Sequence, residues 1–137
     1  MNYLGIDYGT KRLGLSVGDD ALKFAVPIEA IPMTTWEKVA QKIAEIGNLR
    51  QIHKIIVGYP FNMDDTIGAK AMEVDRFIHW LERFVSIPIE RIDERLTSEN
   101  VGDLRRRSGK NRRNLRKSGA IDSAAAVLIL QDYLDKI

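Results

Sequence analysis

The chain has 137 residues, 45% of them hydrophobic and 29% charged, which predicts a single globular domain over residues 1–137. It contains no cysteine, so disulfides and thiolate metal sites are excluded, and any metal must be held by oxygen atoms or by the two histidines. The net charge of +2 favours no particular partner, and without a long apolar run or a signal-peptide pattern we expect a cytoplasmic protein with no membrane partner.

Three strands joined by short connections are predicted at the start of the chain. Residues 2–8 and 12–18 are separated by a turn at Gly9-Thr10, which predicts a tight hairpin, and a third strand is expected around residues 23–31. Asp7 interrupts the hydrophobic pattern just before the turn. A carboxylate there suits metal-assisted cleavage of nucleic acid or a nucleotide phosphate loop, and it would also suit a turn in which Asp7 accepts from a nearby amide.

Helices and strands alternate in the remainder of the chain. A helix that begins at Thr34 or Thr35 has apolar residues at helical spacing and is expected to stop near Gly47. The β-branched run at 54–60 is typical of a strand buried on both faces. The later elements are expected to be a helix at 66–84, a strand at 87–93, a helix at 97–107 and a last helix at 121–134. This order predicts an α/β fold with a mixed five-stranded sheet and helices on both faces, a pattern that several three-layer folds share.

Three acidic residues lie at the ends of predicted elements. Asp7 is near the end of the first strand, Glu94 directly follows the strand at 87–93, and Asp122 falls in the first turn of the last helix. Sites in open α/β sheets form where strand ends meet loops. Three carboxylates gathered there would repel unless a cation lay between them, and Mg²⁺ or Mn²⁺ prefers such oxygen ligands and supports phosphodiester hydrolysis. Glu94 and Asp122 have an alternative role as favourable charges at helix N-termini.

A strongly basic segment, residues 103–118, precedes the last helix. It holds eight Lys or Arg residues and one acid, a local charge of +7 on a chain whose remainder carries −5. Such a block favours a polyanion partner, although a solvated loop would have the same composition. Few aromatic residues accompany it, which favours recognition of duplex or junction shape over base stacking. Its cations are Arg105, Arg106, Arg107, Lys110, Arg112, Arg113, Arg116 and Lys117.

Four further residues are predicted to contact nucleic acid. Lys11 and Arg12 follow the turn after Asp7, and Arg95 follows Glu94. Asn62 lies in the loop after the strand at 54–60, where it would orient a phosphate or a water, or else form a local side-chain turn.

These stretches together resemble the YqgF family, whose members are described as Holliday-junction resolvases and as pre-16S ribosomal RNA nucleases. The matching segments are GIDYGTKRLGLSVGD, IIVGYPFNMD, IDERLTS and GAIDSAAAVLILQDYL, in the family's order and over nearly the whole chain. The resemblance implies a ribonuclease H-like fold and a two-metal site with Asp7, Glu94 and Asp122 as ligands. It also implies cleavage of structured nucleic acid, either in maturation of the 5′ end of small-subunit ribosomal RNA or in junction resolution, by a monomer or homodimer that would contact the ribosomal particle.

Two positions depart from the pattern of the resembling proteins. Asp65 stands where the family usually has glycine after the NMD of the middle segment. Ala125 stands where related junction resolvases commonly carry a fourth acid, three residues after the helix acid. The resemblance therefore supplies three carboxylates, and one of the two metals would be held less tightly.

Two other functions fit parts of the sequence. The DYGT hairpin resembles the first phosphate loop of actin-like and sugar kinases, although 137 residues supply only one of the two lobes that such enzymes close on ATP. A non-catalytic RNA-binding factor with purely structural carboxylates would explain the basic segment equally well.

Overall fold

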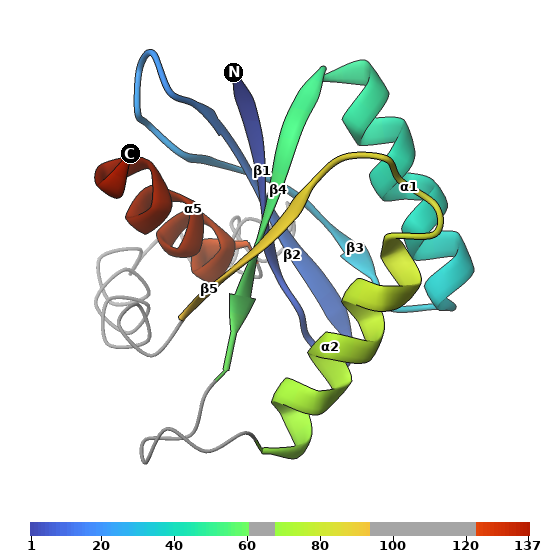
Figure 1. The fold of residues 1–137 in the computed structure, drawn as a ribbon. Coiled ribbons are helices and arrows are strands. Elements are labelled where there is room, and N and C mark those ends of the chain that lie inside the picture. The colour runs from blue at the N-terminus through green and yellow to red at the C-terminus, as the bar shows by residue number, and fades with distance from the viewer. Residues whose placement is uncertain (61–67, 94–122) are drawn as a thin grey trace, which may run out of the picture.

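The computed structural model describes residues 1–60, 68–93 and 123–137, and within them the chain forms one five-stranded sheet and three helices (Figure 1). The strands are β1 (Asn2–Asp7), β2 (Arg12–Asp19), β3 (Val26–Pro32), β4 (Ile52–Tyr59) and β5 (Ile89–Asp93). The helices are α1 (Trp36–Leu49), α2 (Ala69–Leu81) and α5 (Ala124–Lys136). The strand order is β3-β2-β1-β4-β5, with β2 antiparallel to both neighbours and β1, β4 and β5 parallel.

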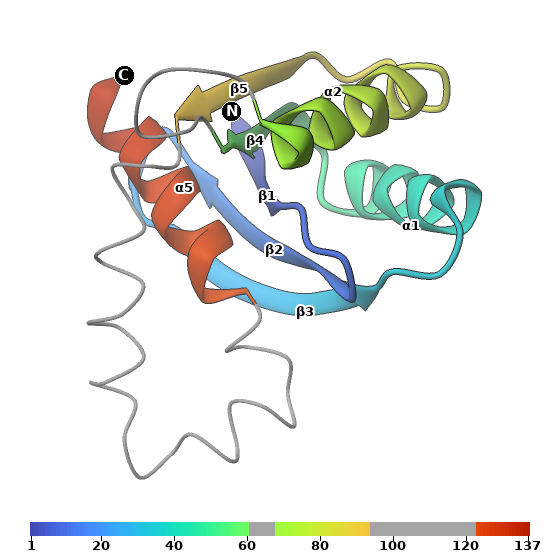
Figure 2. The same cartoon turned by 90° about the horizontal axis from the view of Figure 1, so that it is seen from below.

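The sheet is the middle of three layers. Helices α1 and α2 cover one face and α5 covers the other, as Figure 2 shows. The larger core lies under α1 and α2 and includes Leu4, Ile6 and Phe77, all fully buried. The smaller core lies under α5 and includes Ile56 and Leu130. The predicted mixed five-stranded sheet with helices on both faces is confirmed.

Helix α1 begins where the sequence indicated. Thr35 is the N-cap, and its hydroxyl accepts a hydrogen bond from the amide of Lys38 at 3.2 Å. The expected stop near Gly47 is confirmed, since the helix ends two residues later, at Leu49. Gly47 is also a packing position, since a Cβ there would lie 2.7 Å from the Ile87 side chain.

Helix α5 packs unusually close to the sheet because the strands beneath it carry small residues. A Cβ at Gly5 of β1 would lie 2.8 Å from Leu130 Cβ and 2.9 Å from the Ala126 carbonyl oxygen, and it would also meet the Ser16 hydroxyl. Gly18 of β2 is similarly close, with a hypothetical Cβ 3.0 Å from Leu134. The buried Ser16 donates a hydrogen bond to the Ala126 carbonyl at 2.7 Å. These contacts fix the helix on β1 and β2.

The third strand starts later than predicted. It begins at Val26 rather than at residue 23, because the chain first makes a turn in which Lys23 has φ 52°. The Asp19 carboxylate stabilises this turn by accepting from the Leu22 amide at 2.7 Å.

The other boundaries move by a few residues. Helix α2 ends at Leu81 rather than 84, because the next amides, those of Arg83 and Phe84, bond three residues back in tighter turns. Strand β4 covers 52–59 instead of 54–60, β5 begins at 89 instead of 87, and α5 covers 124–136 instead of 121–134. The predicted helix at 97–107 lies outside the described residues. Within the described ranges, no helix has the length and apolarity that crossing a bilayer requires.

Candidate functional site

The carboxyl ends of the three parallel strands meet at one edge of the sheet. Strand β1 ends at Asp7, β4 at Tyr59 and β5 at Asp93, and we call these three strand ends the carboxyl edge. Tyr59 pairs directly with Asp93, and Ile6 pairs with Val57. In Figure 1 the arrow of β4 points to this edge, from which the chain continues toward α2. This edge is where sites form in open α/β sheets.

Asp7 lies on the face of the sheet that α5 covers. Side chains alternate along a strand. Leu4 and Ile6 belong to the core under α1 and α2, whereas Tyr3 and Gly5 contact the α5 side. Asp7 continues the second set and is half-buried. The structure thus places the first predicted ligand beside the layer that contains α5.

Strand β5 shows the same alternation. Glu90 forms an ion pair at 2.9 Å with Lys54, whose ammonium also donates to Tyr133 of α5 at 3.2 Å. Ile92 packs against the core under α5. Arg91, between them, is on the α2 side. The even-numbered residues of β5 therefore lie on the α5 face, the face that carries Asp7.

The residue before α5 is hydrogen-bonded to both β2 and β3. Ser123 is fully buried, and its hydroxyl accepts from the Leu15 amide at 3.1 Å and donates to the Ile28 carbonyl at 2.7 Å. Leu15 is the antiparallel partner of Ile6, the residue before Asp7. Ser123 therefore lies between β2 and β3 at the start of α5, and β2 is the strand that pairs with β1 as far as Asp7. No pattern in the sequence singled out Ser123; a small polar residue just before an alanine-rich helix is an N-cap signal that could have done so.

A polar cluster on the opposite face joins β4 and β5 to α2. The Tyr59 hydroxyl donates to Asp75 at 2.7 Å, and Arg91 Nε donates to the other oxygen of Asp75 at 2.9 Å. Burial, with the hydrogen bond to Asp75, raises the pKa of Tyr59, so its phenol stays protonated as a donor. The cluster holds the two strand ends in register at the carboxyl edge.

The residue after Asp7 is anchored in the core. Tyr8 is 4% exposed, and its ring lies 5.0 Å from that of Phe77 on α2. Burial raises its pKa, and the nearby Glu73 adds to the effect. The turn that follows needs a glycine, because a Cβ at Gly9 would lie 2.5 Å from the Arg12 carbonyl oxygen. The buried Tyr8 ring and the tight turn at Gly9 together hold the end of β1 in place.

Of the residues predicted to contact nucleic acid, Lys11 and Arg12 are exposed at the start of β2. The Lys11 carbonyl accepts a hydrogen bond from the Met33 amide at 2.8 Å, which joins the β1–β2 connection to the end of β3.

The other predicted site residues lie outside the described residues: Glu94, Asp122, Asn62, Arg95 and all eight cations of the basic segment. Within the described ranges, no three His, Asp or Glu side chains gather closely enough to hold a metal ion. Of the three predicted ligands only Asp7 falls within those ranges.

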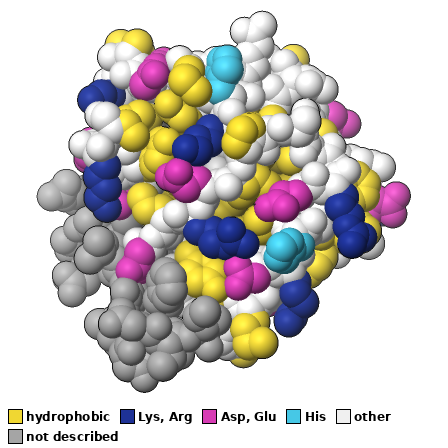
Figure 3. Space-filling model, viewed as in Figure 1, with side chains coloured by type: hydrophobic (Ala, Val, Ile, Leu, Met, Phe, Trp, Pro, Cys, Tyr) yellow, Lys and Arg dark blue, Asp and Glu magenta, His cyan; other side chains and the backbone are white. Residues whose placement is uncertain are grey.

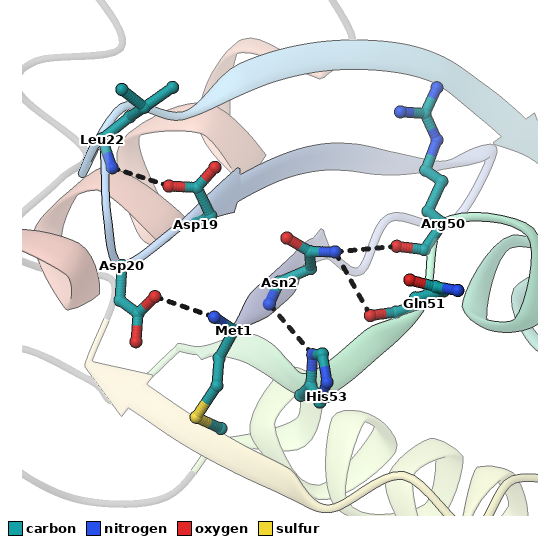
Figure 4. A network of polar contacts seen from close by, with 8 residues as sticks. All are labelled: Met1, Asn2, Asp19, Asp20, Leu22, Arg50, Gln51 and His53. Atoms are coloured by element: carbon teal, nitrogen blue, oxygen red, sulfur yellow. Dashed lines mark hydrogen bonds and ion pairs between the residues drawn. The ribbon is translucent and has the colours of Figure 1, made fainter.

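The described surface has no large area of one charge on the side shown in Figure 3, where basic and acidic side chains alternate. Lys54–Glu90 and Arg91–Asp75 are among the ion pairs that the described residues form. The end of the sheet opposite the carboxyl edge is likewise internally bonded (Figure 4). There the Met1 amino group pairs with Asp20 at 2.8 Å, and the Asn2 amide donates to His53 Nδ1 at 3.0 Å.

Solved structures of resolvases share this fold. RuvC of Thermus thermophilus in complex with a Holliday junction substrate aligns over 99% of this chain and 94% of its own, with a TM-score of 0.58 and 14% identity. The fowlpox virus Holliday junction resolvase aligns over 99% of both chains, with a TM-score of 0.60 and 12% identity. The fold is therefore that of the ribonuclease H-like class to which these resolvases belong.

Sequence comparison identifies the family within that class. The family model RuvX, described as Holliday junction resolvase, matches residues 1–136, and the chain belongs to this family, also called YqgF. A relative from Opitutus terrae, named "Putative pre-16S rRNA nuclease", is 42% identical over 99% of this chain and 92% of its own. Relatives of the same name from Syntrophus aciditrophicus and Chlorobium phaeobacteroides are 37% and 41% identical and are each covered over 90% of their length. The predicted family and its nuclease class are confirmed.

Proposed function

We propose that this chain is an endonuclease that hydrolyses phosphodiester bonds of structured nucleic acid with a divalent metal held by Asp7, Glu94 and Asp122. The observation that carries the proposal is the position of Asp7. It ends β1 on the α5 face of the sheet, at the edge where β5 ends and close to where α5 begins. A half-buried carboxylate at such a convergence is a characteristic position for a metal ligand in an α/β nuclease.

The described neighbours of the other two acids support their inclusion. Glu94 is the residue after Asp93, and it is the next even-numbered position after Ile92, which faces α5. Asp122 is the residue before Ser123, whose hydroxyl is bonded to β2 at Leu15. Neighbouring strands lie about 4.8 Å apart, so β1 and β5 are separated by roughly 10 Å at backbone level, a span that facing carboxylates reduce. The three acids then lie within reach of one cluster of ions.

The donor set fits Mg²⁺ or Mn²⁺. Carboxylates are the preferred ligands of these hard cations, and the chain has no thiolate to favour a softer metal. When bound, such an ion supplies a Lewis acid and a water of lowered pKa for attack on phosphorus. Ala125, in the first turn of α5, has no oxygen to add as a fourth side-chain ligand. We therefore expect the second of two ions to bind more weakly than the first.

We propose the substrate from the basic side chains of this chain and from the names of its relatives. Lys11 and Arg12 are exposed beside Asp7 and would contact phosphates that flank the cleaved bond. The basic segment, residues 103–118, would add sequence-independent affinity that weakens steeply with salt. The names of the curated relatives favour precursor 16S ribosomal RNA, and the family description favours a four-way DNA junction. For the RNA we propose cleavage at the 5′ end, in the cytoplasm and on a ribosomal particle, as the family resemblance implies. Only the junction, which has two-fold symmetry, would require a homodimer.

A cleavage assay tests the proposal. Purified chain is incubated with a precursor 16S RNA fragment and with a four-way DNA junction, each with Mg²⁺, Mn²⁺ or EDTA. We expect cleavage of at least one substrate with metal and none with EDTA. Asp7→Asn should lower the rate on the order of 100-fold or more, since loss of a direct ligand exceeds the usual effect of an outer-shell change, and should leave substrate binding intact.

The matched control is Asp19→Asn at the far end of β2. The same charge is removed there, and the asparagine oxygen can still accept from the Leu22 amide. Its cleavage rate should equal that of the unaltered chain. Equal rates for Asp7→Asn and Asp19→Asn would exclude the assigned site, and binding of both substrates without any cleavage would favour a non-catalytic RNA-binding factor.

A further inference from the structure

The hydrogen-bond ladder between β2 and β3 is interrupted next to the candidate site. The register of the two strands shifts between Leu13 and Leu15, and beyond the shift Leu15 is the partner of Ile28. The Ser123 hydroxyl stands at this pair, where it accepts from the Leu15 amide at 3.1 Å and donates to the Ile28 carbonyl at 2.7 Å. A hydroxyl has a single proton to donate, so that proton is committed to Ile28.

This bridge ties three parts of the molecule together at a buried point. Ser123 is 0% exposed and its bond to the Leu15 amide is buried, so that amide would be left without a hydrogen-bond partner if the hydroxyl were absent. On the strand side, Leu15 is paired with Ile6, which precedes Asp7. On the helix side, Ser123 is the N-cap residue of α5 and follows Asp122 directly. The bridge therefore joins Ser123, the residue after one proposed ligand, to β2, the strand that pairs with the end of β1, where the other proposed ligand lies.

We infer that Ser123 is a positioning residue for the metal site, in that its hydroxyl fixes the start of α5 on β2, the strand that pairs with β1 as far as Asp7. The inference rests on the proposed function, because it concerns the ligands Asp7 and Asp122. Residues that hold ligands in place contribute to metal affinity without touching the ion. The close contacts at Gly5 and Gly18 lie further along α5, at Ala126, Leu130 and Leu134.

Ser16 provides a matched control. It is also a fully buried serine that joins β2 to α5, with a donor–acceptor distance of 2.7 Å to the Ala126 carbonyl. Its bond reaches the helix three residues after Ser123. Removal of either hydroxyl loosens α5, but only removal of the Ser123 hydroxyl releases the residue next to Asp122.

The experiment measures Mn²⁺ binding to the full chain without nucleic acid, by electron paramagnetic resonance of the free ion. Ser123→Ala should raise the Kd for Mn²⁺ by about 10-fold or more, the usual size of an outer-shell effect, whereas Ser16→Ala should change it less than about 2-fold. Circular dichroism gives the folded fraction of each variant, and the Kd values refer to folded protein. Hydrogen exchange of the Leu15 amide should accelerate in Ser123→Ala and stay unchanged in Ser16→Ala.

A second variant covers the case in which Ser123→Ala does not fold. Ser123→Cys has a similar shape and a weaker donor, so it should raise the Kd for Mn²⁺ above that of the unaltered chain, by less than the roughly 10-fold expected of complete hydroxyl loss. Equal Kd changes in Ser123→Ala and Ser16→Ala, or an unchanged Kd in Ser123→Ala, would overturn the inference alone. Absence of Mn²⁺ binding by the unaltered chain would overturn the metal site of the proposed function and the inference with it.

Discussion

The two ends of the central sheet use their charged side chains in different ways. At the end opposite the carboxyl edge, Asp19 accepts from a turn amide and Asp20 pairs with the Met1 amino group, so both acids hold the backbone together (Figure 4). At the carboxyl edge, Asp7 stands at a strand end beside the exposed Lys11 and Arg12. Acidic residues therefore occur at both ends of the sheet, and Asp7 is the one of these three that we propose as a metal ligand.

The direction of the helices adds to the difference between the two ends of the sheet. Helices α1 and α2 follow strands that end at the carboxyl edge, and α5 starts beside Leu15, so all three described helices begin on that side of the sheet (Figure 1). The N-terminal end of a helix carries a partial positive charge. The carboxyl edge therefore favours anions such as phosphate, and the opposite end receives the negative helix termini.

The largest expected difference between the two ends is in stabilisation by metal. At a Mn²⁺ concentration 100 times its Kd, a folded protein gains about 2.7 kcal/mol in the free energy of unfolding. The unaltered chain and Asp19→Asn should both show a raised Tm under these conditions, and Asp7→Asn should not. Thermal denaturation followed by circular dichroism, with and without Mn²⁺, measures this. A full Tm increase in Asp7→Asn would show that the metal binds elsewhere.

A smaller effect is expected from the close packing of α5. Gly5→Ala should lower the free energy of unfolding by about 1–3 kcal/mol, because the new methyl group meets Leu130 and the Ala126 backbone. Gly47→Ala is the control: its methyl group meets only the flexible end of Ile87, and alanine gains about 1 kcal/mol of helix propensity over glycine. Urea denaturation should show a clear loss for Gly5→Ala and little change for Gly47→Ala. A larger loss of stability for Gly47→Ala than for Gly5→Ala would mean that α5 is not closely packed on β1.

The smallest effect concerns pH at the end opposite the site. The hydrogen bond from the Met1 amino group lowers the pKa of Asp20 below its ordinary 3.8. Its contribution to stability is therefore present above pH 3.8 and is lost as pH falls through the lowered pKa. Asp20→Asn should be less stable than the unaltered chain at pH 7, and the difference should shrink below pH 3.8. Urea denaturation at a series of pH values measures it, and a difference independent of pH would contradict the ion pair.

The sequence was sufficient to predict the layers of the fold and the place of Asp7. Periodicity identified every described strand and helix, since buried apolar residues recur at the spacing of each element. It located the stop of α1 near Gly47, but it did not show that Gly47 itself makes room for the Ile87 side chain. It also extended the third strand through Lys23, whose positive φ belongs to a turn.

Much less of the candidate site followed from the sequence alone. Asp7 was found because a carboxylate interrupts a hydrophobic strand, a local signal. The bonds of Ser123 join residues 108 and 95 positions apart in the chain, and no local pattern reports contacts over such separations. The roles of Glu94, Asp122, Asn62, Arg95 and the basic segment stay predictions.

The bridge made by Ser123 also bears on the order in which the molecule can be assembled. β2 and β3 are close in the sequence and can pair early, but their ladder has a gap that only a residue from the last helix fills. Contacts between distant parts of a chain form late and slow the folding of a domain. During synthesis the gap in the β2–β3 ladder would stay open until Ser123 leaves the ribosome, and the start of α5 would take its place on β2 only then.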